Sequence, residues 1–155
     1  MSKIEIGQPS PDFSLPATDD QTLSLADFGG RNVVLFFYPK ASTPGCTQEG
    51  QDFRDLLGEF EAANTAVIGI SRDSVRAQQN FKDKYDFNFP LLADTEETVC
   101  SLFGVIKEKN MYGRKVMGVE RSTFLIDAGG TLRREWRGVK VKGHAEEVLE
   151  AVRQL

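Results

Sequence analysis

RNVVLFFYP, residues 31–39, is a continuous apolar and aromatic run that ends at Pro39. A strand without polar alternation is typical of the centre of an α/β sheet, where both of its faces are buried. The run is far too short to span a bilayer. It therefore predicts a central strand, around which the other segments can be arranged.

Strand-like and helix-like segments alternate on both sides of this strand. Upstream, weak strand signals occur at residues 4–7, 13–17 and 21–28, the last turning at Gly29-Gly30. Downstream, the pattern predicts helices at 44–60, 74–87, 95–105 and 144–155, and strands at 65–73, 89–94, 121–127 and 131–138. The last two strands form a predicted hairpin. This order favours an α/β, thioredoxin-like fold: a central mixed β-sheet flanked by helices, with an N-terminal β extension.

Length and charge limit the function classes. A chain of 155 residues indicates a single domain over residues 1–155. The net charge is −4, from 19 basic and 23 acidic residues, so binding to nucleic acid or to an acidic membrane surface is disfavoured. The N-terminus has no apolar signal-peptide core, and we expect a cytoplasmic protein with no membrane association. Two cysteines and one histidine make neither a disulfide framework nor a structural metal site.

Cys46 lies where the central strand gives way to a helix, the edge at which α/β sheets place their sites. Thr43 suits the N-cap and Pro44 the first helical position, which puts Cys46 in the first turn. Free N–H groups and the helix dipole favour an anion there, and a thiolate is such an anion and a nucleophile. Pro39 and Pro44 stiffen the loop. The alternative is a buried cysteine that acts only as a small apolar side chain.

The segment YPKASTPGCTQE, residues 38–49, resembles the active-site segment of the peroxiredoxins, most closely the peroxiredoxin Q or bacterioferritin comigratory protein branch. A second block, residues 105–127, is similar to the segment in which that branch carries its catalytic arginine. The resemblance implies that Cys46 is the peroxidatic cysteine, Thr43 orients the peroxide, Pro39 shields the site and Arg121 stabilises the thiolate. Glu49 either supports Arg121 or is a solvated helix charge.

The chain departs from the family at the positions of the second, resolving cysteine. The two positions where the branch carries it correspond to Gln51 and Lys82. Three roles stay open for the remaining thiol, Cys100: a buried core residue, an internal resolving thiol, or a thiol that forms a disulfide between two chains or reacts only incidentally. Our hypothesis is a one-cysteine mechanism, in which an external thiol attacks the Cys46 sulfenic acid.

The resemblance implies a thiol-dependent peroxidase that reduces hydrogen peroxide and small organic hydroperoxides. Thioredoxin, glutaredoxin or a small thiol would supply the electrons, no metal, flavin or haem cofactor would be needed, and the enzyme would be a monomer. The main alternative is a peroxide-responsive redox sensor or holdase without efficient turnover. A thioredoxin-type disulfide reductase is disfavoured because Gln48 and Glu49 follow Thr47, so the second cysteine of a Cys-x-x-Cys pair is not in place.

Two further features have competing interpretations. His144, the only histidine, is either a helix cap or solvent-exposed residue, or the partner of Cys46 in a Cys–His hydrolase pair. The basic segment RREWRGVKVKG, residues 133–143, is either a solvated strand face or a docking patch for a protein reductant.

Overall fold

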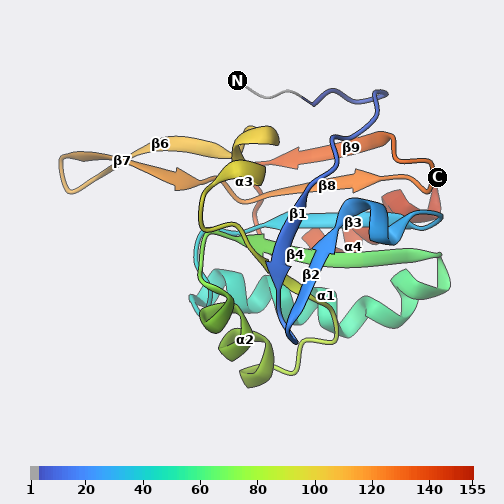
Figure 1. Cartoon of the computed structure of the whole chain (residues 1–155), viewed down its shortest axis with the longest axis horizontal. Helices are drawn as coiled ribbons and strands as arrows, with labels where there is room; N and C mark the ends of the chain where they lie inside the picture. The colour runs from blue at the N-terminus through green and yellow to red at the C-terminus, as the bar shows by residue number, and fades with distance from the viewer. Residues whose placement is uncertain (1–3) are drawn as a thin grey trace.

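The computed structural model describes residues 4–155, which fold around one seven-stranded sheet (Figure 1). The strand order is β2-β1-β5-β4-β3-β8-β9. The strands are β1 (Ser14–Ala17), β2 (Gln21–Ser24), β3 (Asn32–Phe37), β4 (Thr65–Ser71), β5 (Leu91–Ala93), β8 (Ser122–Ile126) and β9 (Leu132–Arg137). The helices are α1 (Pro44–Ala62), α2 (Val75–Lys84), α3 (Thr98–Leu102) and α4 (His144–Arg153), with a short 3-10 helix at Leu25–Phe28.

Strand β3 lies inside the sheet, as its sequence predicts. It pairs parallel with β4 and antiparallel with β8, so that Val34 lies opposite both Val67 and Leu125. Every residue from Val33 to Tyr38 is buried. The sheet is mixed, because β3, β4 and β5 run parallel while the β8–β9 hairpin runs antiparallel. The expected mixed α/β sheet is therefore confirmed.

Alternate residues of β3 enter two separate cores, one on each face of the sheet. Val34, Phe36 and Tyr38 pack with buried residues of α1, α2 and α4. Val33, Leu35 and Phe37 pack with residues of α3 and β1 on the opposite face. Helices thus cover both faces, and any residue of α1 is separated from any residue of α3 by the sheet (Figure 1).

Two expectations for the strands need correction, and one hairpin is unexpected. Residues 4–7 form no strand, and the segment at 21–28 is a strand only as far as Ser24. The Asp27 carboxylate accepts the Ser24 N–H (2.8 Å) and helps to start the 3-10 helix. The sequence pattern also misses a hairpin, β6 (Ile106–Met111) and β7 (Arg114–Val119), because its residues are largely polar and give no apolar run.

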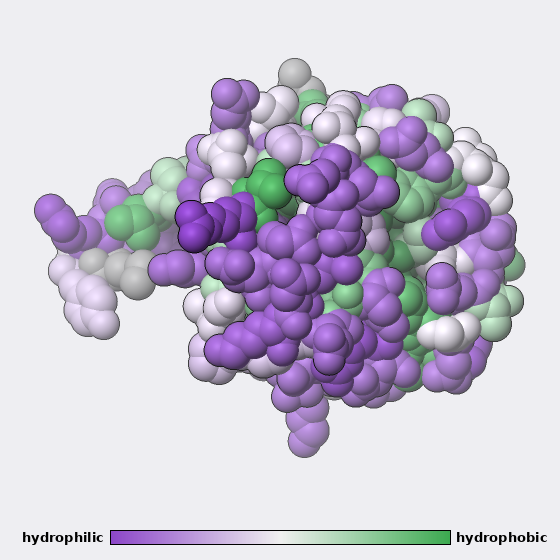
Figure 2. All heavy atoms as spheres, turned by 60° about the horizontal axis from the view of Figure 1, so that its bottom comes forward, coloured by the Kyte–Doolittle hydropathy of each residue, from purple (hydrophilic) through white to green (hydrophobic). Residues whose placement is uncertain are grey.

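The β6–β7 hairpin forms its own two-stranded sheet and extends from the body of the molecule (Figures 1 and 2). The face drawn in Figure 2 is covered mainly by hydrophilic side chains. Strand β7 leads through Glu120 directly to Arg121, so this hairpin determines where the arginine enters the site.

No helix within residues 4–155 is both long enough and apolar enough to cross a membrane.

Candidate active site

Cys46 is the third residue of α1 and is 1% exposed. Thr43 is the N-cap residue, with extended backbone angles (φ −82°, ψ 155°), and Pro44 opens the helix, as expected. The Thr43 side chain, however, makes no capping bond to the helix; its hydroxyl donates to the Lys40 carbonyl at 2.7 Å. The thiol therefore lies at a helix N-terminus whose first turn has no side-chain cap.

Arg121 reaches Cys46 from the short link between β7 and β8. Its Nη2 lies 3.4 Å from the Cys46 Sγ, and its Nη1 donates to the Glu49 Oε1 at 2.7 Å. Gly45 leaves room for this approach, because a Cβ there would lie 3.1 Å from the arginine Nη2. The guanidinium thus joins the thiol to a carboxylate one turn further along α1.

Glu49 is 1% exposed, so its interpretation as a solvated helix charge is wrong. Burial raises the pKa of this carboxyl from 4.5 to about 7, although Arg121 acts to lower it. The Oε2 atom is buried and has no hydrogen-bond partner among the described residues. For the Arg121 guanidinium, burial by itself lowers the pKa, but Glu49 and Cys46 together raise it above its ordinary value.

The loop between β3 and α1 is fixed by a residue that the sequence analysis missed. Asp73 Oδ2 accepts the Ala41 N–H at 2.8 Å and the Ser71 hydroxyl at 2.6 Å. Asp73 follows β4, the parallel neighbour of β3, so its position at the same sheet edge could have been read from the strand order. Pro39 is half-buried at the start of this loop. Asp73 therefore fixes the segment that carries Pro39 and Thr43.

Cys100 lies in the core on the opposite face of the sheet from Cys46. It is completely buried in α3, packed with Val99 and Phe103, as the core interpretation expects. Burial, followed by the nearby Asp94 carboxylate, raises the pKa of the Cys100 thiol far above its ordinary value. The same carboxylate accepts the backbone N–H of Cys100 at 2.7 Å and of Val99 at 3.2 Å. Cys100 is thus a protonated core thiol at neutral pH.

His144 is the first residue of α4 and is buried, so its solvent-exposed interpretation is wrong. Its Nε2 lies 2.8 Å from the Thr123 hydroxyl, and its ring packs edge-on against Phe53 and Trp136. Burial lowers the pKa of His144 to about 4, with Arg121 acting in the same direction and Glu147 against it. Among the described residues, its hydrogen bond goes to Thr123 and not to the Cys46 sulfur.

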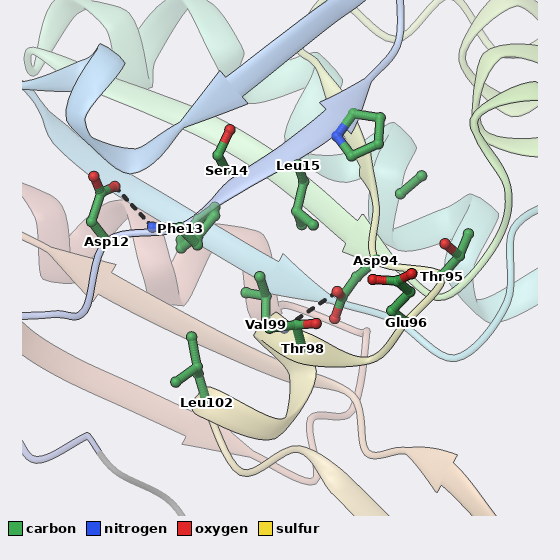
Figure 3. Close-up of a pocket in the computed structure, with 12 residues that line it drawn as sticks. Asp12, Phe13, Ser14, Leu15, Asp94, Thr95, Glu96, Thr98, Val99 and Leu102 are labelled. Carbon is green, nitrogen blue, oxygen red and sulfur yellow. Dashed lines mark hydrogen bonds between the residues drawn. The ribbon is translucent and has the colours of Figure 1, made fainter.

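A separate cavity of about 420 Å³ opens between β1 and α3, on the Cys100 side of the sheet (Figure 3). Both oxygens of its buried acid, Asp94, are engaged by the α3 backbone N–H groups described above. The lining residues include neither cysteine, histidine nor arginine. This cavity therefore offers no thiol, and the Cys46 region is the candidate site for thiol chemistry.

The comparisons with known proteins agree with one another. The model of the AhpC/TSA family matches residues 6–135. A peroxiredoxin Bcp of Xanthomonas campestris is 50% identical over 156 residues, covering 99% of this chain and 97% of that protein. A peroxiredoxin Bcp of Bacillus subtilis is 45% identical over 152 residues, covering 98% of this chain and 97% of that protein.

Two solved structures are similar over nearly their whole length. A peroxiredoxin Q of Xylella fastidiosa, carrying a serine in place of one cysteine, superposes with a TM-score of 0.94 at 42% identity, covering 99% of this chain and 98% of that one. The X. campestris bacterioferritin comigratory protein gives a TM-score of 0.88 at 48% identity, covering 92% of this chain and 90% of that one. That structure is described as a trapped intermediate and ligand complex that gives insight into alkyl peroxide reduction activity.

Proposed function

The chain belongs to the AhpC/TSA family, in its Bcp or peroxiredoxin Q branch, and is a thiol-dependent peroxidase; on this premise we propose that Cys46 is its peroxidatic cysteine and that an external thiol completes the cycle. The resemblance stated from residues 38–49 and 105–127 is thereby confirmed. The observation that carries the proposal is the hydrogen bond between Arg121 and the Cys46 sulfur at a helix N-terminus.

In the proposed first step the Cys46 thiolate attacks one oxygen of the peroxide. The sulfur–oxygen bond forms while the oxygen–oxygen bond breaks, leaving a sulfenic acid on Cys46 and hydroxide or an alkoxide, which takes up one proton. The Arg121 guanidinium stabilises the thiolate before the attack and the charge that develops on the oxygens during it. Glu49 holds the guanidinium through its 2.7 Å ion pair, which supports its role as a positioning residue.

Thr43 is proposed to orient the peroxide. Its hydroxyl proton is directed to the Lys40 carbonyl, which leaves the lone pairs of the hydroxyl oxygen free to accept from a peroxide O–H. Pro39, half-buried beside this segment, limits the access of water to the thiolate. Asp73 accepts hydrogen bonds from Ala41 and Ser71. These bonds keep Thr43 and Pro39 at fixed positions relative to Cys46.

In the second step an external thiol attacks the sulfenic acid and releases water, which gives a mixed disulfide; a second thiol then releases Cys46 as a thiol. A disulfide to Cys100 requires Cα atoms within about 7 Å. Cys46 and Cys100 belong to cores on opposite faces of the sheet, so forming that bond would require the fold around one of them to open. Gln51 and Lys82 occupy the two positions where, by the resemblance, the branch carries its resolving cysteine. These observations favour the one-cysteine mechanism.

The incoming thiol must also reach a sulfur that is 1% exposed. The absence of a side-chain bond from the N-cap residue to the helix lowers the cost of opening the first turn of α1. We propose that unwinding this turn exposes the sulfenic acid to the reductant. A redox sensor or holdase would share the peroxide step but would show little recycling.

The substrates proposed are hydrogen peroxide and small organic hydroperoxides. The alkyl peroxide reduction described for the X. campestris relative supports the second class. Thioredoxin, glutaredoxin or a small thiol is the proposed source of electrons.

Turnover of Cys100→Ala tests the mechanism, since alanine leaves no thiol and only a small change in volume. With dithiothreitol as reductant, steady-state peroxide consumption by Cys100→Ala should stay within about twofold of the wild type. Cys46→Ser is the matched control and should consume no peroxide. If Cys100→Ala formed the Cys46 sulfenic acid normally but could not be recycled by any thiol, Cys100 would be the resolving cysteine.

A further inference from the structure

The segment from Arg133 to Lys142 concentrates positive charge in an otherwise acidic chain. It holds five basic residues and a single acidic one, Glu135, which gives a local net charge of +4 against −4 for the whole chain. The segment comprises most of β9, which is the last strand at one edge of the sheet, and the loop that leads to α4. An edge strand and its following loop are accessible to a partner.

The five cations divide into those already engaged and those that are free. Arg133 pairs with Asp127 at 3.2 Å, and Arg137 donates to the carbonyls of Phe103 and Gly104. In the described part of the chain, neither Lys140 nor Lys142 has a carboxylate within ion-pair distance, and both are exposed.

The free cations gather around an aromatic side chain. The Arg134 guanidinium lies 4.8 Å from the centre of the Trp136 ring. Trp136, Lys140 and Lys142 line an open hollow of about 260 Å³ whose floor includes the buried His144. Glu147 is the acidic residue at this hollow. We call Arg134, Trp136, Lys140 and Lys142 the basic patch.

The basic patch is joined to the site of the peroxide chemistry through the backbone of Arg121. The Val139 N–H, between Trp136 and Lys140 in sequence, donates to the Arg121 carbonyl at 2.9 Å. His144, under the hollow, packs on Phe53 in the middle of α1, the helix that carries Cys46 in its first turn. Because Arg121 itself contacts the Cys46 sulfur, the bond from Val139 to its carbonyl places a partner bound on the patch near the N-terminal end of α1, where the sulfenic acid must be reduced.

We propose that the basic patch is the docking surface for an acidic protein reductant, a dithiol protein of the thioredoxin type whose contact face carries carboxylates. This rests on the proposed function, because it assigns the partner of the second step. The cations lie along an open edge and loop, which suits a broad complementary face better than a compact ligand. A half-buried tryptophan flanked by cations has the composition of an interface anchor, and the charges around it steer the encounter.

The test compares two reductants on one charge-reversal variant, Lys140→Glu/Lys142→Glu. With an acidic thioredoxin kept reduced by its reductase and NADPH, kcat/KM for the protein reductant should fall about tenfold or more, mainly through KM. With dithiothreitol as reductant, the variant should lose much less of its turnover rate. The ratio of the thioredoxin rate to the dithiothreitol rate should therefore be lower in the variant than in the wild type. In the wild type, the rate with thioredoxin should also fall as salt is added, because salt screens exposed charges.

The matched control is Arg76→Glu/Lys84→Glu on α2, which changes the net charge by the same amount at two other exposed positions. It should leave the thioredoxin rate near that of the wild type. An equal loss in both variants would mean a general charge effect, and an unchanged rate in Lys140→Glu/Lys142→Glu would mean that docking occurs elsewhere; either result overturns the proposal.

Two more outcomes separate this inference from the proposed function. If Lys140→Glu/Lys142→Glu lost turnover with reduced glutathione as severely as with thioredoxin, the patch would recognise the carboxylates of a small thiol and the protein-docking proposal would be wrong. If peroxide oxidised Cys46 in the wild type but no protein reductant recycled it, the docking proposal would be wrong, whereas the proposed peroxide step would be supported. Failure of Cys46 to oxidise would remove the proposed function itself.

Discussion

Arg121 Nη2 lies 3.4 Å from the Cys46 Sγ, although 75 residues separate the two in sequence. The contact depends on β7 and β8, which bring the arginine to the N-terminal end of α1, and on Gly45, which leaves space for the guanidinium. Because the same guanidinium also binds Glu49, the thiol, the cation and the carboxylate form one connected unit. Changes in any member should therefore affect the other two.

Arg121→Ala should slow the oxidation of Cys46 by hydrogen peroxide about 10²–10³-fold, as expected when a donor aimed at developing charge is removed. Stopped-flow measurement of the oxidation rate checks this. Because the variant also leaves Glu49 buried without its cation, Arg121→Ala/Glu49→Gln provides a version without that buried charge. Arg133→Ala, which removes an exposed ion pair with Asp127, is the control and should react normally. Near-normal rates in the double variant would remove Arg121 from the mechanism.

Glu49→Gln should change how stability depends on pH. The pKa of Glu49 is about 7 in the folded chain against 4.5 ordinarily, so between these values the folded chain binds more protons than the unfolded chain. Its contribution to the free energy of unfolding therefore falls as pH rises from about 4.5 to 7. Urea unfolding of Glu49→Gln should show stability rising relative to the wild type across this window. His144 titrates in both proteins and largely cancels in the difference, and a pH-independent difference would contradict the account.

Asp73→Ala should loosen the loop that carries Pro39 and Thr43, because it removes the acceptor of the Ala41 N–H. The oxidation rate of Cys46 should fall about tenfold, while the free energy of unfolding falls by only about 1–2 kcal/mol. Rapid-mixing kinetics well below the melting temperature separate the two effects. Asp83→Ala, at an exposed acid of α2, is the control. A loss of stability without a change in rate would assign Asp73 a structural role only.

Substitution by alanine at two glycines of α1 should change the free energy of unfolding in opposite directions. At Gly50 a Cβ would lie 2.4 Å from the Phe87 ring, so Gly50→Ala should destabilise the fold by about 1–3 kcal/mol through overpacking. At Gly58 a Cβ meets nothing within 4 Å, so Gly58→Ala should stabilise by about 0.5–1 kcal/mol through helix propensity. Denaturant unfolding of both variants tests the packing of α1, and equal signs would contradict it.

The sequence predicts the centre of this fold well, because β3 is an unbroken apolar run and Cys46 follows it at a helix start marked by Thr43 and Pro44, residue types typical of the N-cap and first helical positions. It does not predict the β6–β7 hairpin, whose polar strands lack an apolar period. Glu49 shows the limit at the site: a carboxyl three positions after Cys46 fits a solvated face or a buried ion pair equally well. Its burial is decided by Arg121, which reaches it only through the tertiary fold.

The same limit applies to the residues that lie far from Cys46 in sequence. Whether Cys100 could resolve the sulfenic acid depends on which face of the sheet α3 covers, and residue spacing does not specify that face. The burial of His144 depends on Phe53 and Trp136, which come from other elements. Local patterns thus predict elements and candidate nucleophiles, whereas partners and burial follow from topology.

The intact mass of the fully reduced protein after one equivalent of hydrogen peroxide, with Cys46→Ser as control, shows directly whether Cys46 is the peroxidatic cysteine. We expect a rapid gain of one oxygen in the wild type and in Cys100→Ala, and no rapid change in Cys46→Ser. A loss of two hydrogens that disappears in Cys100→Ala would contradict the one-cysteine mechanism, and no rapid change in the wild type would contradict the assignment of Cys46 as the peroxidatic cysteine.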